Sequence, residues 1–397
     1  EARTWRFNLR IALMQTLQTY EQEVSLNTFI SDCIKQQCAH LGDLGFITAF
    51  TPDNMQDDQD FEALIKSRDP ETINKLKKRL CEPRPNPKNP DQPFDSFLEL
   101  VKKRFRWEVL AEFGHQSTRG RALPAVGAAV VSINAEKLEH AVQLLKEQIK
   151  AKLDPSHEPT KQAVRQFVLG LCHRLIKRGA IYQEFYHDEF FKTLGKNTYG
   201  SFGLRRWLPN VMRGYAPTFL SNQDSRYFDA IPRSDDSTSW YANWTNRCFR
   251  HVTYKFTDQK RISPFNVALE VLSSTDVGIL KFISIQSTQQ NLIQCWGLQL
   301  EALEVSTYPV AFCDQQEQQF YYLPKHLKEQ WLDAPAILKN SKGTLKVHPN
   351  PPPSYFTELF KSGNVQRVIA REHTGLLTRK TREPTEDLFK ADPALPW

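Results

Sequence analysis

Few residues in this sequence stand at spacings that could support catalysis. Nucleotide hydrolysis needs a glycine-rich loop ending in Gly-Lys-Ser/Thr, because backbone N–H groups, a lysine and a metal-binding hydroxyl must converge on the phosphates. The nearest string is Gly195-Lys196-Asn197, which lacks both the upstream glycine and the hydroxyl. The acidic pair in His187-Asp188-Glu189-Phe190 is a poor match to a metal-binding box. We interpret both strings as coincidences.

Motifs of metalloproteases and serine hydrolases do not occur either. The sequence contains neither His-Glu-x-x-His nor Gly-x-Ser-x-Gly, and its 10 histidines are scattered along the chain. We therefore expect no catalytic residue here and no self-contained enzyme.

One set of positions resembles a zinc ribbon that has lost its later ligands. Cys313 is present, and Gln316, Ala336 and Ser341 occupy the positions where three more cysteines would complete a four-thiolate site. An amide, a methyl group and a hydroxyl cannot supply thiolates, so we predict no zinc at this place. An ordinary loop with one cysteine is the alternative.

The cysteines indicate a reducing compartment. There are 7, an odd number, and none stands at Cys-x-x-Cys spacing from another. This pattern is typical of free thiols in the cytosol, so we expect a cytoplasmic protein. Cys172 and Cys248 lie among apolar neighbours and are predicted to be small buried side chains.

Basic side chains are the main candidates for binding. Lys and Arg (52) exceed Asp and Glu (45), which gives a net charge of +7 that is compatible with a polyanionic partner. Two clusters stand out, one on a helix at 94–113 and one at the end of a later helix. They comprise Lys102, Lys103, Arg104 and Arg106, then Lys177 and Arg178. Phosphate contact is the functional interpretation, and a solvated charged face is the alternative.

Apolar periodicity predicts the elements that position these residues. Steps of three and four predict helices at 5–20 and 29–38, and again at 94–113. A further helix opens at Thr160 and stops at Lys177-Arg178-Gly179. Residues 83–93 hold five prolines, which predicts a stiff exposed connector that is either a boundary or a long surface loop.

A helix followed by two strands is expected near the middle of the chain. Pro264 starts the helix, and residues 278–283 and 295–300 form two strands around a polar turn. This order is typical of a winged-helix module. Such modules bind nucleic acid, dock proteins or serve a structural purpose, so the fold leaves the function open.

An aromatic segment precedes that module and includes Trp207, Trp240 and Trp244. Exposed aromatic rings can stack on single-stranded bases. Trp240 and Trp244 are four residues apart beside Cys248, however, which favours one helix face packed into a core.

The whole chain is long enough for two to four domains of roughly 100–200 residues. No apolar run approaches the ~20 residues of a membrane span. The start without Met and the abrupt end at Trp397 lead us to expect an excised fragment.

We expect a mainly α protein with small β elements (α+β). The expected segments are a helical region (1–82), a Pro-rich connector (83–93), a basic helix with a strand-like segment and an amphipathic helix (94–157), a helical, winged-helix-like module with the aromatic segment (158–250), a winged-helix module (251–308), a degenerate zinc-ribbon-like element (309–348) and a C-terminal segment (364–397).

The C-terminal segment has the most specific pattern. It reads Val365-Gln366-Arg367-Val368-Ile369-Ala370-Arg371-Glu372-His373-Thr374-Gly375-Leu376-Leu377-Thr378-Arg379, then Arg382-Glu383 and Glu386-Asp387-Leu388-Phe389-Lys390. This resembles the strand, His-x-Gly-type turn and helix that start the second RecA-like domain of large superfamily-2 DEAD/DEAH-box DNA helicases of the Lhr and YprA-like kind. The resemblance implies a motor turn at His373, Thr374 and Gly375, with Arg371 or Arg379 near the nucleic-acid backbone or the inter-domain cleft. Pro384 departs from the pattern but is tolerated in a first helical turn.

Three further features resemble the very large helicase subunits of bacterial anti-phage systems of the Druantia and DISARM type. They are residues 106–114, the run Arg121-Ala122-Leu123, and the layout of winged helix and emptied zinc ribbon. The resemblance implies an accessory region inserted before the second motor domain of a longer ATP-dependent helicase. The ATP and Mg²⁺ sites would then lie upstream of these residues.

The function that this implies is to guide DNA beside a motor, with DNA and the remaining helicase domains as partners and no membrane. The alternative is a protein-interaction scaffold that docks subunits of a defence complex. Salt separates the two, because phosphate contacts weaken steeply with salt and a packed protein interface does not. A free-standing transcriptional regulator is disfavoured because no dimerisation heptad is evident.

Overall fold

The computed structural model describes residues 4–91, 93–153, 158–184, 207, 217–223, 228–232, 239–249, 263–286, 292–349, 354–363 and 365. Within these residues, helices combine with small sheets, so the expected α+β class is confirmed. No helix in the described part of the chain is long and apolar enough to cross a membrane.

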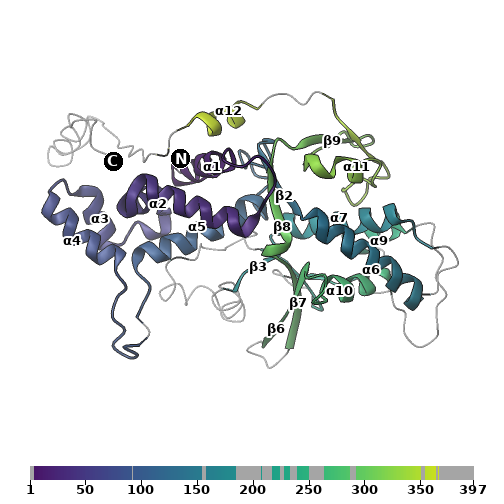
Figure 1. The fold of residues 1–397 in the computed structure, drawn as a ribbon, viewed down its shortest axis with the longest axis horizontal. Coiled ribbons are helices and arrows are strands. Elements are labelled where there is room, and N and C mark those ends of the chain that lie inside the picture. Colours follow the sequence, from purple (N-terminus) through teal and green to yellow (C-terminus); the bar gives the residue numbers. More distant parts are fainter. Residues whose placement is uncertain are drawn as a thin grey trace, which may run out of the picture.

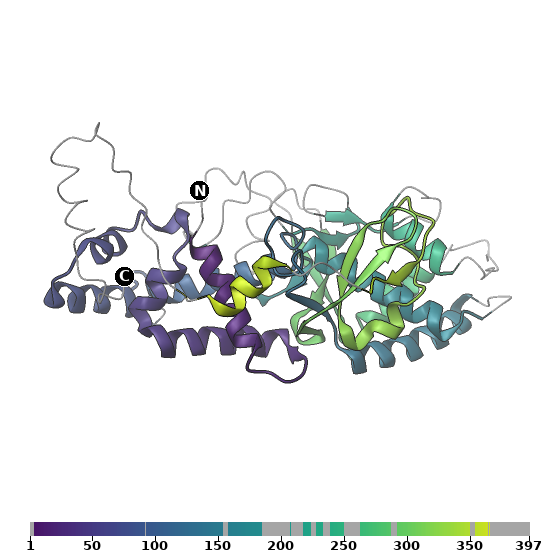
Figure 2. The same ribbon diagram turned by 90° about the horizontal axis from the view of Figure 1, so that it is seen from above.

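The N-terminal third is helical. Its elements are α1 (Thr4–Leu17), α2 (Leu26–Phe50), the short 3₁₀ helix η1 (Asp53–Met55), α3 (Gln59–Lys66), α4 (Pro70–Cys81) and α5 (Phe97–Phe113). These helices form one end of an elongated molecule, coloured purple to blue in Figures 1 and 2. They pack around fully buried rings such as Phe29, Phe46 and Trp107. The helices expected at 5–20 and 29–38 are confirmed, although α2 extends farther and bends at Gly42, whose φ is +70°.

The middle of the chain packs a second group of helices. These are α6 (Ala135–Leu153), α7 (Lys161–Arg178), α9 (Trp240–Cys248) and α10 (Pro264–Leu272). Thr160 caps α7 by accepting a hydrogen bond from the amide of Ala163, and Gly179 ends it in the left-handed conformation. The start and stop predicted from the sequence are therefore confirmed. Cys172 and Cys248 are buried, as expected.

The strands of the described residues form three small sheets. The first has the order β1-β8-β2, and the second centres on β7, which pairs with β6 along one edge and with β3 and β4 along the other. Strand bounds are β1 (Val24–Ser25), β2 (Ala129–Ile133), β3 (Ile181–Tyr182), β4 (Phe219–Ser221), β5 (Phe228–Ala230), β6 (Leu280–Gln286), β7 (Leu292–Gln299) and β8 (Leu303–Thr307). The 3₁₀ helix η4 (Leu300–Ala302) joins β7 to β8.

The third sheet belongs to the C-terminal part and has the order β10-β9-β11. Its elements are β9 (Val310–Asp314), β10 (Phe320–Leu323), η5 (Lys325–Leu327), α11 (Lys328–Trp331) and β11 (Leu345–Val347). The last helix of the described residues, α12 (Tyr355–Ser362), returns to the N-terminal end and lies on α1, with the rings of Phe7 and Phe360 5.5 Å apart (Figure 1).

The proline-rich segment is a long surface loop between two packed helices. Arg84 and Phe94 exchange both backbone hydrogen bonds, N to O at 3.0 and 2.8 Å, and so close the loop at its base. Because α4 and α5 pack on each other below the loop, the two segments joined by it share one core.

Candidate nucleic-acid interface

Helix α5 forms where the sequence predicted a basic helix. Ser96 caps it by accepting a hydrogen bond from the amide of Glu99, and Gly114 follows its last turn. Apolar side chains such as Val101 and Phe105 are buried against the neighbouring helices. The helix is thereby held along its apolar side, and the basic side chains between these positions determine what its other side can bind.

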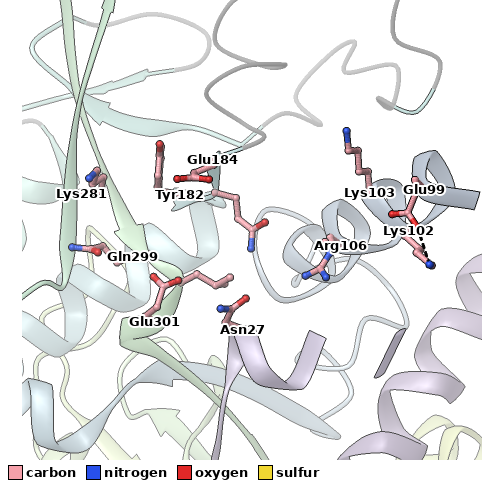
Figure 3. Close-up of a pocket in the computed structure, with 12 residues that line it drawn as sticks. Asn27, Glu99, Lys102, Lys103, Arg106, Tyr182, Glu184, Lys281, Gln299 and Glu301 are labelled. Carbon is pink, nitrogen blue, oxygen red and sulfur yellow. Dashed lines mark hydrogen bonds and ion pairs between the residues drawn. The ribbon is translucent and has the colours of Figure 1, made fainter. Parts of the chain in front are cut away.

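An open groove of about 600 Å³ lies between α5 and the β6–β7 hairpin (Figure 3). Lys102, Lys103 and Arg106 line one wall, and Lys281 of β6 lines the opposite wall. The start of α2, the residues around β3 and the end of β7 complete the lining. The fold therefore places a strand cation from 175 residues farther along the chain across the groove from three of the four cations predicted on α5.

Carboxylates and amides also line the groove. The acidic residues are Glu99, Glu184 and Glu301, and the amides are Asn27, Gln183 and Gln299. With four cations and three carboxylates, the groove is weakly basic and rich in hydrogen-bonding groups. Such a surface suits a ligand that combines negative charge with polar edges, as nucleotides do.

The cations of α5 differ in how they are paired. Lys102 donates to Glu99 at 2.9 Å and Lys103 to Asp95 at 2.6 Å, both at exposed positions. Arg106 makes no ion pair within the described residues, and burial lowers the pKa of its guanidinium. An exposed pair is worth little in water, so a phosphate can replace it at small cost. Among the described residues, therefore, no ion pair of Arg106 has to be broken before it contacts a phosphate.

Arg104 has a different place from its neighbours. It is 4% exposed, and its guanidinium donates to Glu108 at 2.7 Å, to Asn54 at 2.9 Å and to the carbonyl of Trp207 at 3.0 Å. Arg104 is thus an internal ion-pair residue and not a surface cation, so we remove it from the predicted phosphate contacts. The sequence of basic residues at 102–106 does not by itself distinguish Arg104 from Arg106.

The second predicted basic pair lies outside the groove, at the end of α7. Arg178 binds Asp229 through two hydrogen bonds of 2.9 and 2.6 Å, and Tyr241 donates to the same carboxylate at 3.0 Å. Lys177 is half-buried, and desolvation lowers its pKa to about 8. The structure brings neither residue to the cations of α5, so phosphate contact by Lys177 and Arg178 stays a prediction.

The β6–β7 hairpin also presents apolar side chains. Phe282 faces Trp296 across the ladder, with ring centroids 5.2 Å apart. Phe282 is 44% exposed and Leu292, on the same face, is 54% exposed. By contrast, Trp240 and Trp244 stack at 5.4 Å in the interior, so the core interpretation of that aromatic pair is confirmed.

The element that resembled an emptied zinc ribbon is organised by an arginine. Arg247 of α9 donates through Nη1 to the carbonyls of Ala336, Leu338 and Ser341 at 2.6, 3.1 and 3.0 Å. The side chain of Gln316 accepts from the amide of Lys342 at 2.8 Å, which joins the two loops. No three His, Cys, Asp or Glu side chains of the described residues gather as a metal site would require.

Several predicted residues lie outside the described residues. They are Arg371, His373, Thr374, Gly375 and Arg379 of the C-terminal segment, together with the strings at 187–190 and 195–197. Conversely, sequence reasoning missed Lys281 because a single lysine on a strand gives no sign of the helix that it faces.

Comparison of the chain with protein-family models, with curated proteins and with solved structures finds no match.

Proposed function

We propose that this chain is a DNA-guiding accessory region of a large ATP-dependent superfamily-2 helicase. One observation supports the DNA contact above all others: Lys102, Lys103 and Arg106 of α5 line the same groove as Lys281 of β6. Cations on both walls can hold a phosphate backbone between them, and the amides and Tyr182 can contact the bases.

We take the bound nucleic acid to be a single strand, because an unpaired strand offers both its phosphates and its base edges to the cations, amides and tyrosine that line the groove.

The parent helicase is proposed from the sequence pattern at 365–390. In that proposal, His373, Thr374 and Gly375 belong to the motor turn and Arg371 or Arg379 approaches the backbone or the cleft. ATP and Mg²⁺ bind other parts of the parent chain. The parent helicase acts in the bacterial cytoplasm as a subunit of an anti-phage system. The order of α10 and the β6–β7 hairpin supports a winged-helix module at 251–308, and the β10-β9-β11 sheet supports the ribbon-like element at 309–348.

The groove is tested by anisotropy with a labelled single-stranded oligonucleotide of about 8 nucleotides, over a salt series and without ATP. Arg106→Gln is expected to weaken binding about tenfold at low salt, because it removes a charge-assisted contact. It should also reduce the slope of log K against log salt by about 0.7.

Lys339→Gln is the matched control, because Lys339 is exposed on the ribbon-like element, away from the groove. Equal binding by Arg106→Gln, Lys339→Gln and the unchanged chain would contradict a DNA contact in the groove.

A protein-docking scaffold is the second candidate, and the hairpin favours it. Phe282 and Leu292 expose apolar surface on one face of β6–β7, next to the half-buried Trp296. Aromatic side chains are enriched where proteins dock. The same salt series separates the two functions: binding to a partner subunit through this face should change little with salt.

A further inference from the structure

Helix α4 presents an exposed basic face that the sequence analysis did not single out. Asp69 caps the helix, Pro70 opens it, and Leu76 and Leu80 are buried against the core. The opposite side of the helix exposes lysines. We call Lys75, Lys77 and Lys78 the α4 basic face; each is exposed, and none forms an ion pair within the described residues.

Two exposed acids, Glu71 and Glu82, also lie on this face, one turn from Lys75 and Lys78, and neither forms an ion pair within the described residues. Arg79, next in sequence, is taken up by Asp60 at 3.2 Å. Asp69 is held chiefly by Thr72, which donates to it from both its amide and its hydroxyl, and Lys75 adds a weaker attraction. Three lysines therefore share this face with two glutamates, which leaves the face with a small net positive charge.

The α4 basic face joins the groove through α5. The two helices pack on each other, and the charges of Lys77 on α4 and Lys102 on α5 both act on the thiol of Cys81. Lys102 also lines the groove. Lys77 and Lys102 therefore lie near the same thiol, and Lys102 continues the cations of α4 into the groove.

Two projections extend from the same side of the molecule (Figure 1). One is the loop after α4, closed by Arg84 and Phe94, and the other is the β6–β7 hairpin. Phe94 is 53% exposed at the base of its loop. Helix α5, which lines the groove, lies between the two projections in this view, so a strand bound in the groove can leave toward α4.

We propose that the α4 basic face binds the phosphate backbone of the same nucleic-acid strand after it leaves the groove. This inference rests on the proposed function and deepens it, because it states the path and the length of the bound strand. A membrane surface is less suitable as the partner, since the apolar side chains Leu76 and Leu80 are buried and cannot insert into a bilayer.

The test compares a short single-stranded oligonucleotide of about 8 nucleotides with a long one of about 30. The variant replaces Lys75, Lys77 and Lys78 with Gln, which keeps helix propensity at exposed positions. We expect its affinity for the long strand to fall at least about tenfold and its salt slope to fall by about 2, at about 0.7 for each phosphate contact. Affinity for the short strand should change less than about twofold, since that strand occupies the groove alone.

The control replaces Lys325, Lys339 and Lys342 with Gln, which removes the same charge from exposed positions on the ribbon-like element. If the α4 variant and this control bind the long strand equally, the α4 path is wrong, while Arg106→Gln still reports on the groove through the short strand. The inference would also be overturned if the α4 variant no longer bound anionic vesicles but kept its full affinity for the long strand.

Discussion

At the scale of single residues, pairing decides what each basic side chain can do. Arg104 and Arg106 are two positions apart on α5, yet one has three internal partners and the other lines a groove. Glu108 is the centre of the internal network, because it binds Arg104 at 2.7 Å and Arg6 at 3.4 Å while being 3% exposed. A buried cation that loses such a partner is strongly destabilising.

Glu108→Gln is therefore expected to lower the free energy of unfolding by about 3 kcal/mol, as measured by urea denaturation. Glu62→Gln is the control, because Glu62 forms an exposed pair with Lys66 at 3.3 Å and should change the free energy by less than about 1 kcal/mol. Equal effects of the two substitutions would contradict the internal role of the Arg104 network.

At the scale of elements, the ribbon-like sheet depends on a helix that lies outside it. Trp240 of α9 donates to the carbonyl of Ile337 at 2.8 Å, and Arg247, two turns later, donates to three more carbonyls of the same loop. Gly343 packs closely against Asp314, since a Cβ added at Gly343 would stand 2.4 Å from Oδ1 of Asp314. One guanidinium thus holds together a loop that has little regular structure of its own.

Arg247→Met should open this loop. Hydrogen bonds to a charged donor are worth about 1.5–3 kcal/mol, and the two N–H groups of Nη1 serve three carbonyls of the loop. Hydrogen exchange should accelerate at the amide of Ala336, which donates to Gly343 at 3.0 Å. Lys339→Met, in the same loop and exposed, should leave that amide unchanged; equal protection in both variants would argue against Arg247 as the organiser.

At the scale of the whole molecule, His326 joins segments that are far apart in the chain. Its Nδ1 lies 2.9 Å from Glu23, ahead of β1, and its Nε2 lies 2.7 Å from Glu304 on β8. Burial alone would lower the pKa of His326, but the two carboxylates outweigh it and raise the pKa above 6.5. The protonated ring therefore holds the N-terminal helices to the C-terminal part.

This linkage has a definite sign. Because the pKa is higher in the folded state, the contribution of His326 to stability is complete below about pH 6.5 and is lost as pH rises through the folded-state pKa. Urea unfolding from pH 5.5 upward should show this loss in the unchanged chain and not in His326→Gln. A pH profile that the substitution does not alter would refute the linkage.

Much of the local structure follows from the sequence by itself. Helices α5, α7 and α10 and the β6–β7 hairpin form where apolar spacing, caps and stops predict them, and Trp240 and Trp244 pack inside. Side-chain periodicity and capping act within a few residues, so they can be read from the order of amino acids.

The candidate site was decided by tertiary structure. Tertiary packing places Lys281 across the groove from α5 and turns Arg104 inward. Burial and ion pairing are set by partners distant in the chain, such as Asn54 and Trp207 around Arg104. The sequence determined the charges and the helices, and only packing determined which charges remain available to a ligand, because desolvation and pairing depend on neighbours in space.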